Sequence, residues 1–372
     1  MGSDRVRVGI IGANPDRGWA ARAHIPALRA LPDFEITAVG TSREASAQEA
    51  ARRFGVPHAF TDPRSLAAHP EVDLVAVTVK VPFHFELIQA ALEAGKHVYC
   101  EWPLVRTSEE AEVLAEAARD AGVHATVGLQ ARHSPAIGHA RELIADGHIG
   151  RVTSATVYAA RAKGAGARMP AGFEYTLDLA NAAGTLEVVG GHTLDALEQL
   201  VGRIAELSAG LSVQHPRMTV SETGETIEVT SPDQIVLHAT TAGGAAISAH
   251  IHDAKATDGR TRIEITGTGG DLAIVSGPGG PGGIQMSELR ILGSQGVGGP
   301  WQELPIPDGY RRIPEAARGT EVANVAQTYV RIADDLRTGG RTTPDFDEGL
   351  RLHRLLDAVR RSAETGTRQS VR

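Results

Sequence analysis

The spacing of apolar and polar residues divides the chain into two parts of different character. Over the first 130 residues, short apolar runs alternate with stretches whose apolar residues recur at helical spacing. Strands are predicted over residues 5–12, 34–40, 72–79, 96–100 and 123–130, and helices over 19–31, 44–55, 83–95 and 107–121. This alternation is typical of a parallel, doubly wound sheet. It predicts an α/β Rossmann-like domain over residues 1–130.

Residues 131–372 follow a different pattern, in which strand-like segments succeed one another from residue 149 onward. One predicted helix (184–202) interrupts them, and two more (about 318–338 and 346–365) end the chain. The pattern predicts an α+β domain with an open, mainly antiparallel sheet. Small and apolar residues in "AAISAHI" (245–251) suggest that a second copy covers one sheet face, because large exposed apolar faces are rare in monomers. We therefore expect a homodimer or homotetramer.

Composition narrows the choice of partners. The net charge is −8, from 37 basic and 45 acidic residues, and no polybasic run is present, which argues against nucleic acid and membrane partners. A single cysteine, Cys100, excludes an intramolecular disulfide and fits a reducing compartment. No signal-peptide core precedes the first strand, and no apolar run approaches ~18 residues. We expect a cytoplasmic protein that acts on a small molecule.

The first strand runs into "GIIGANPDRGWA", the position of a dinucleotide fingerprint. Gly12 supplies the tight turn, but Asn14 replaces the second glycine and Gly18 comes late. Asparagine tolerates positive φ better than most residues, so the backbone could still approach a pyrophosphate closely. Trp19 either covers the cofactor or packs in the core. The alternative is a βα turn without a ligand.

The end of the second predicted strand bears on the choice of cofactor. An NAD site usually places an acid there to bind the ribose hydroxyls. This chain has Thr41, Ser42 and Arg43 instead. Two hydroxyls and a guanidinium suit a 2′-phosphate, so we expect NADP rather than NAD, unless Arg43 is only a solvated residue of the helix's first turn.

The segment "YCEWPL" places Glu101, Trp102 and Pro103 at the carboxyl end of a strand, where α/β sheets bind ligands. Further motifs are "VGIIG", "AHIPAL", "ALEAGKHVYCEWPL", "VGLQARHSPAI", "ELIADGHIGRV", "GGHTLDAL", "IEITGTGGDL" and "TPDFDEGLRLHRLLDAV". Together they resemble the Gfo/Idh/MocA family of NAD(P)-dependent oxidoreductases over nearly the whole chain. The motifs look most like the branch that contains the fungal galactose-pathway repressor, a dinucleotide-binding regulator.

The resemblance implies an active site that this chain only partly retains. The family combines the lysine of an E-K-P motif with an aspartate and a histidine one helical turn apart. Here the lysine position is Trp102, the histidine is His192 with Asp195 completing an H-x-x-D pattern, and the aspartate position is Val188. Glu187 lies one place earlier, about 100° around the helix, so it should not take over the role.

The remaining catalytic candidates are few. His192 is the best acid–base candidate, because histidine titrates near neutrality. Lys80 follows the 72–79 strand, and we hypothesise that it contributes the charge of the missing lysine. Tyr175, Tyr158 and Lys163 are further candidates, each of which could equally be a surface residue.

Other residues are expected near the cofactor. Trp102 could stack on a nicotinamide or a sugar face, or fill the domain interface. Val79, Lys80, His84, Glu101 and Gln130 complete the expected cofactor-binding set, and His84 could also cap or orient the helix that follows it. The histidines of "HIHD" (250–253) alternate along one strand, and we expect no catalytic metal because no suitable ligand set is present.

Two functions follow from these patterns. The leading one is an NADP-dependent oxidoreductase that transfers hydride between nicotinamide and a sugar-like or other small carbonyl or alcohol substrate. The alternative is a catalytically silent dinucleotide-binding sensor that acts through a protein partner. Trp102 and Val188 favour the sensor, whereas His192 and Asp195 favour the enzyme.

Overall fold

The computed structural model describes residues 5–277, 282–318 and 321–371. The chain forms two compact units: residues 1–129 with 312–351, and residues 130–311 with 352–372. The predicted second domain, 131–372, is therefore too large, because residues 312–351 pack with the first unit. The reason is that the apolar residues of this segment, including Val325 and Tyr329, belong to the same buried core as the first strand.

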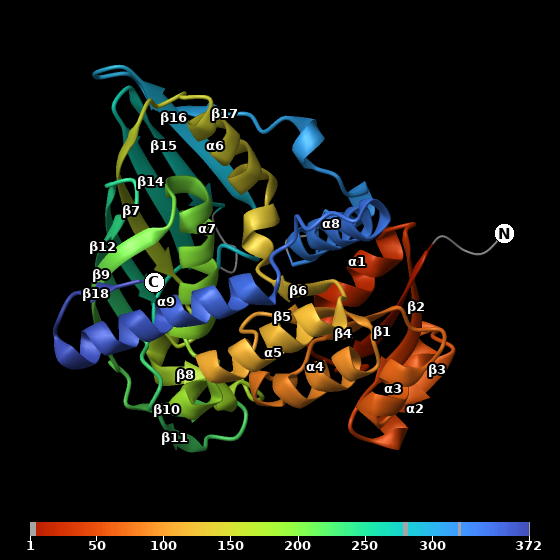
Figure 1. Ribbon diagram of the computed structural model, residues 1–372. Coiled ribbons are helices and arrows are strands. Elements are labelled where there is room, and N and C mark those ends of the chain that lie inside the picture. The colour runs from red at the N-terminus through yellow and green to blue at the C-terminus, as the bar shows by residue number, and fades with distance from the viewer. Residues whose placement is uncertain (1–4, 278–281, 319–320, 372) are drawn as a thin grey trace. The chain divides into compact units, whose positions relative to one another are not determined.

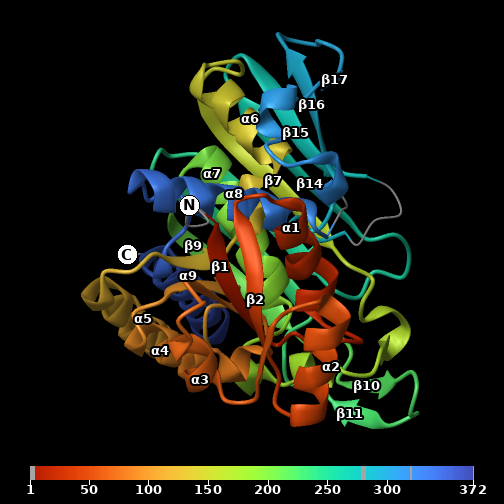
Figure 2. The same ribbon diagram turned by 90° about the vertical axis from the view of Figure 1, so that its right-hand side faces the viewer.

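The first unit is built on a six-stranded parallel sheet in the order β3-β2-β1-β4-β5-β6, which confirms the predicted doubly wound fold. Its strands are β1 (Val6–Ile11), β2 (Phe34–Gly40), β3 (His58–Phe60), β4 (Leu74–Val77), β5 (His97–Glu101) and β6 (Ala125–Gly128). Its helices are α1 (Ile25–Ala30), α2 (Glu44–Phe54), α3 (Pro63–Ala68), α4 (His84–Glu93), α5 (Ser108–Ala121) and α8 (Ala323–Thr338). Figure 2 shows α1 and α2 on one side of β1 and β2, and α3, α4 and α5 on the other.

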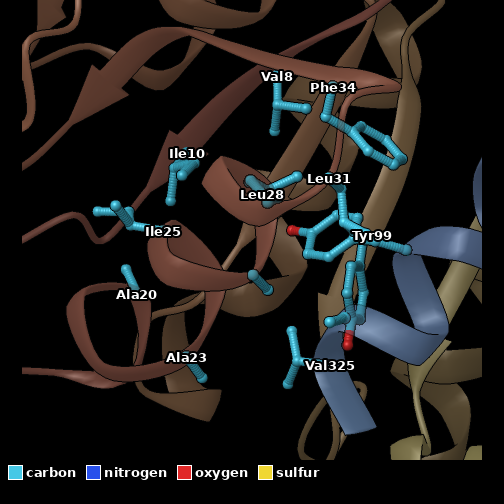
Figure 3. Packing of buried hydrophobic residues seen from close by; sticks show 14 of the residues in the cluster. Val8, Ile10, Ala20, Ala23, Ile25, Leu28, Leu31, Phe34, Tyr99 and Val325 are labelled. Atoms are coloured by element: carbon cyan, nitrogen blue, oxygen red, sulfur yellow. The ribbon is translucent and has the colours of Figure 1, made fainter. Parts of the chain in front are cut away.

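The core on the α1 side is drawn in Figure 3. Val8 and Ile10 of β1 pack with Leu28 of α1, Phe34 of β2 and Val325 of α8, all of them fully or almost fully buried. Burial of this apolar area is the main term that holds the helices on the sheet.

The second unit contains a nine-stranded sheet in the order β17-β16-β15-β14-β7-β13-β12-β9-β18 and a small sheet, β11-β10-β8. In the larger sheet, β7 and β13 pair in parallel and the other neighbours are antiparallel, as predicted. Figure 1 shows α6 and α7 along one face of this sheet.

The strands of the second unit are β7 (Val152–Ala160), β8 (Arg168–Met169), β9 (Ile204–Ser212), β10 (Arg217–Val220), β11 (Thr226–Glu228), β12 (Gln234–Thr241), β13 (Ala246–His252), β14 (Arg260–Gly267), β15 (Gly270–Ser276), β16 (Leu289–Gln295), β17 (Gln302–Leu304) and β18 (Gln369–Ser370). The helices are α6 (Pro135–Ala145) and α7 (Gly191–Val201). A last helix, α9 (Phe346–Thr365), begins among the residues of the first unit and ends among those of the second.

Local signals account for several helix ends. The Thr107 side chain caps α5 by accepting a hydrogen bond from the Glu110 amide at 3.2 Å. Gly55 ends α2 with a φ of +58°. The apolar pattern missed β3, α3 and α6, which are short or follow directly on another turn. Among the described residues, no helix is long and apolar enough to cross a membrane.

Candidate active site

The turn after β1 requires glycine at position 12. Gly12 has a φ of +98°, and a Cβ built there would lie 2.8 Å from a Val79 methyl and 2.9 Å from the Thr78 hydroxyl. Its amide donates to the Gly40 carbonyl at 2.9 Å, which ties the turn to the end of β2. Glycine is therefore required here both by the positive φ and by the close approach of the turn to Thr78 and Val79 after β4, and a tight glycine turn at this position is a feature of dinucleotide sites.

Asn14 stabilises the same loop in a way that the sequence did not predict. Its Oδ1 atom accepts hydrogen bonds from the amides of Asp16 (2.9 Å) and Arg17 (3.2 Å). Among the described residues, the non-glycine positions with positive φ are Ala167 and Ala182, so Asn14 does not adopt the left-handed conformation that asparagine tolerates.

The end of the glycine loop leads into packed structure. Gly18 has a φ of +105°, with open space around the position of a Cβ. Trp19 is partly buried against the α1-side core, and the Arg22 guanidinium lies 5.9 Å from the centroid of its ring. Trp19 therefore packs against the core of the first unit, which is one of the two roles expected for it.

The end of β2 presents hydroxyls and a cation. The Thr41 hydroxyl lies 2.6 Å from the Ser46 hydroxyl and donates to the Arg43 carbonyl at 3.1 Å. Ser42 and Arg43 are exposed, and Arg43 is the N-cap residue of α2. The strand end thus carries a guanidinium and the first turn of a helix, without a carboxylate at positions 40–43.

The loop after β4 is held by a buried histidine. His84 Nε2 lies 3.1 Å from the Val79 carbonyl oxygen, and Nδ1 lies 3.0 Å from that of Pro103. Burial lowers the pKa of His84. The residue thus connects the ends of β4 and β5 and is a positioning residue. Lys80 is exposed immediately before the short helical turn Val81–Phe83.

The end of β5 is part of a buried polar network. Glu101, which is 9% exposed, has its Oε1 atom 2.9 Å from His24 Nε2, and His24 Nδ1 lies 2.8 Å from the Tyr329 hydroxyl. Trp102 is only 4% exposed and precedes Pro103 through a cis peptide bond. Glu101 is therefore occupied in holding α1 and α8 to the strand end.

His192 in α7 does not titrate near neutrality, contrary to the expectation from sequence. It is 2% exposed, and burial, followed by the charge of Arg161, lowers its pKa to about 3. Its Nδ1 atom has no hydrogen-bond partner among the described residues. His192 is consequently a neutral imidazole that can exchange hydrogen bonds but cannot serve as a cationic acid at pH 7.

The carboxylates around His192 are paired with arginines. Asp195 is fully buried and forms a two-point ion pair with Arg132, including a 3.0 Å contact from Nε to Oδ2. Glu187 accepts from Arg360 at 2.7 Å and from the Gly184 amide at 3.0 Å. Both carboxylates are therefore engaged in ion pairs within the second unit.

Lys163 stands out among the second unit's candidates. It lies three residues after the end of β7. This segment stays beside the end of β13 through backbone hydrogen bonds, one of which the Gly164 amide donates to the Asp253 carbonyl at 2.7 Å. Its Nζ donates to the Thr176 hydroxyl at 3.0 Å and lies 4.8 Å from the centroid of the Phe173 ring. Burial, and then the charge of Arg161, lowers its pKa to about 8.

The hydrogen bonds of the Thr176 hydroxyl fix the Lys163 amine in place. The hydroxyl donates to the Phe173 carbonyl at 2.7 Å and therefore accepts a hydrogen bond from Lys163 rather than donating one. Lys163 and Thr176 line a cavity of about 30 Å³ together with Thr185, Ser231 and Asp253, a volume that suits one small polar group or a water. Sequence spacing could not predict this cluster, because its members come from distant segments.

The other candidates take more ordinary places. Tyr175 is partly buried in the turn Glu174–Leu177, and burial raises its pKa. The Tyr158 hydroxyl lies 3.1 Å from His252 Nε2 on the neighbouring strand. Gln130 is buried, and its Oε1 atom has no partner among the residues that the structure describes.

Substitution of Gly12 tests the turn. Gly12→Ala should weaken dinucleotide binding at least tenfold, because the methyl group collides with Val79 and Thr78 at a positive φ. Gly55→Ala is the matched control: its φ is also positive, but no described atom lies within 4 Å of the added carbon. Each should cost about 1 kcal/mol or more of stability, yet only Gly12→Ala should change the Kd measured by fluorescence titration. Equal Kd values for both variants would contradict this role of Gly12.

Comparison with known proteins supports the division into two parts. The family described as "Oxidoreductase family, NAD-binding Rossmann fold" (GFO_IDH_MocA) matches residues 6–129, and the C-terminal domain of Gal80p matches residues 135–276. The chain is 34% identical to dehydrogenase aclE of Aspergillus oryzae over 63% of this chain and 67% of aclE.

Two further relatives match almost the full chain. The GAL80 regulatory protein of Saccharomyces cerevisiae is 26% identical over 98% of this chain and 94% of that protein. The structure of a super-repressor mutant of Gal80p from the same organism has a TM-score of 0.88 at 24% identity, and the match covers 99% of this chain and 98% of that chain.

Levoglucosan dehydrogenase of Pseudarthrobacter phenanthrenivorans is 26% identical over 96% of both chains. The structure of a levoglucosan dehydrogenase in complex with NADH and levoglucosan has a TM-score of 0.84 at 24% identity and covers 99% of each chain. These matches agree with the fold and with the glycine turn described above. The chain belongs to the Gfo/Idh/MocA family of oxidoreductases with an NAD(P)-binding Rossmann fold.

Proposed function

We propose that this protein is an NADP-dependent oxidoreductase that interconverts a secondary alcohol and a ketone on a small sugar-like molecule. The observation that carries the proposal is Lys163, an amine with a pKa of about 8 that lines a polar cavity and is fixed by Thr176. It provides the proton-transfer group that Trp102 lacks. The names of the related levoglucosan and fungal dehydrogenases favour the same class of reaction.

The reaction needs a hydride acceptor and a base. Bound nicotinamide supplies the hydride chemistry at its C4 atom. In the oxidation direction, neutral Lys163 takes the hydroxyl proton while the carbinol C–H bond breaks and the C=O bond forms, so that the products are a ketone, the reduced cofactor and an ammonium. His192, as a neutral imidazole, orients the same oxygen through a hydrogen bond. In the reverse direction the Lys163 ammonium returns the proton.

Arg161 tunes both groups. Its charge disfavours protonation of Lys163 and of His192. Asp253 holds Arg161 through a 2.6 Å ion pair and partly offsets the effect on Lys163. A lysine with a pKa near the working pH is a better proton donor and acceptor than an ordinary surface lysine.

For the cofactor, we propose that the Gly12 turn receives the pyrophosphate and that Thr41, Ser42 and Arg43 receive the 2′-phosphate. The fit rests on the tight positive-φ turn at Gly12, where a Cβ would collide with Val79 and Thr78, and on the guanidinium at the end of β2. In the same proposal, Asn14, Gly18, Trp19, Val79, Lys80, Trp102 and Gln130 surround the cofactor, whereas His84 and Glu101 act indirectly by holding the loops.

The second candidate function is a silent sensor that binds NADP and recruits a protein partner. It is favoured by Trp102 at the lysine position, by the arginine pairing of Asp195 and Glu187, and by the similarity to GAL80. Both functions are compatible with the proposed homodimer or homotetramer, for which the exposed face of the nine-stranded sheet around Val236 and Ser248 is the candidate surface.

The primary test is turnover. The purified protein should reduce NADP⁺ when offered a panel of anhydrosugars, aldoses and inositols, monitored by absorbance of the reduced cofactor. We expect at least one member of the panel to be oxidised through many catalytic cycles per protein molecule, far above the rate without protein, because positioned proton and hydride transfer lowers the barrier greatly. A protein that binds NADP tightly yet turns over none of the panel would support the sensor.

Replacement of Lys163 should reveal the proton-transfer group. In alcohol oxidation, kcat/KM should rise as pH increases through about 8, because the neutral amine is the base. Lys163→Met should slow turnover about 100-fold or more and abolish this transition. Lys255→Met removes a lysine that is hydrogen-bonded to Thr257 and should change neither the rate nor the pH transition.

Lys80→Met tests whether Lys80 supplies the missing charge. A lower rate with an unchanged pH transition would show that Lys80 contributes charge but does not transfer the proton. A transition that persists without Lys163 excludes it as the base.

Arg43 is expected to set the cofactor preference. Arg43→Ala should raise the Kd for NADP about tenfold, the effect of losing one charge-assisted hydrogen bond, and should leave the Kd for NAD unchanged. Arg52→Ala removes an exposed arginine that pairs with Glu49 on the same helix and should change neither constant. Isothermal titration measures all of them. Tighter binding of NAD than of NADP by the unmodified protein would overturn the assignment.

A further inference from the structure

A cluster of two imidazoles and a carboxylate lies on the first unit, in a part of the sheet that the proposed function does not use. His58 is the first residue of edge strand β3, His69 is the C-cap residue of α3, and Glu71 follows two residues later. One potential ligand atom from each lies within 4.8 Å of the other two. The rings of His58 and His69 are 4.2 Å apart between centroids.

The cluster is held in place by the backbone around it. The Val72 amide donates to the His69 carbonyl at 3.1 Å, and the Thr37 hydroxyl donates to the Glu71 carbonyl at 2.5 Å. Lys96 Nζ donates to the His69 carbonyl as well, at 3.3 Å. The turn that carries two of the three side chains is therefore fixed before any ligand arrives, which reduces the entropy cost of binding.

A hydrogen bond already joins two of the three side chains, at the place where a cation could bind. His58 Nε2 lies 2.5 Å from Glu71 Oε2, and this hydrogen bond, followed by opposing burial and then the charges of His58 and His69, lowers the pKa of Glu71. Arg7, whose charge also reaches Glu71, is engaged by Asp73 at 2.6 Å. A metal ion placed between Nε2 and Oε2 would take both atoms as ligands and gain a third ligand from His69.

We propose that His58, His69 and Glu71 form a binding site for Zn²⁺, with water as the fourth ligand. Two imidazoles and one carboxylate are a ligand set that zinc accepts in tetrahedral geometry with one open position. The partly exposed cluster has access to metal from solution. The ion would join β3 to the turn after α3 and would stabilise the edge of the sheet, independently of any reaction at the opposite, carboxyl end of the strands.

The test is calorimetric titration of the full-length protein with ZnCl₂ after dialysis against EDTA. The unmodified protein should bind one equivalent with a micromolar Kd, and saturating Zn²⁺ should raise its Tm by several degrees, because the ion binds the folded state preferentially. His58→Ala and His69→Ala should each weaken this binding at least tenfold and remove the increase in Tm.

Two further variants keep the result interpretable. Glu71→Gln preserves the size of the side chain and removes its charge, so it should also weaken binding if the site is real, even where a histidine variant folds poorly. His238→Ala removes an exposed histidine of β12 in the second unit and should leave the one-equivalent binding intact. Zinc binding that is absent, or that is unchanged in all three cluster variants, would overturn the proposal.

Discussion

The hydrogen-bonded chain from Glu101 through His24 to Tyr329 is the interaction on which the first unit depends. It joins the end of β5 to the turn that precedes α1 and to α8, which is more than 200 residues away in sequence. All three groups are buried, so each would be costly to leave without a partner, typically about 1–3 kcal/mol. The same burial, followed by the charge of Glu101, raises the pKa of the neighbouring Tyr99 well above its usual value. Together with the shared apolar core, this network holds α8 in the Rossmann unit although the chain reaches α8 only after the second sheet.

The network also changes the meaning of the Glu101-Trp102-Pro103 segment. In a doubly wound sheet, ligands bind at the carboxyl ends of the strands, so a carboxylate there is a candidate for ligand binding. Here the Glu101 carboxylate is hydrogen-bonded to the buried His24. His84 joins the residue after β4 to the Pro103 carbonyl after β5. The segment is thus fixed by packing and hydrogen bonds, and Trp102 adds a large, mostly buried aromatic surface. The local fold accepts an indole at this point because the neighbouring side chains hold the loop.

Electrostatics in the second unit follow from burial more than from sequence position. His192 lies in an H-x-x-D segment, yet its surroundings keep it neutral, whereas Lys163, which belongs to no motif, has a pKa of about 8. Arg161 contributes to both shifts because its own charge is held in place by Asp253. An arginine fixed near two basic groups lowers the proton affinity of both.

The sequence by itself determined the alternation of strands and helices, the two-part plan and the family, because periodicity, glycine placement and motif spacing are properties of the linear chain. It placed the end of α2 at Gly55 and the start of α5 at Thr107 from local chemistry alone. It could not place α8 with the first unit, pair Asp195 with Arg132, or gather His58, His69 and Glu71, because each of these depends on contacts between segments that no local pattern connects. Only tertiary structure decides which side chains lose water and which charges face them, and these two quantities set the chemistry of His192 and Lys163.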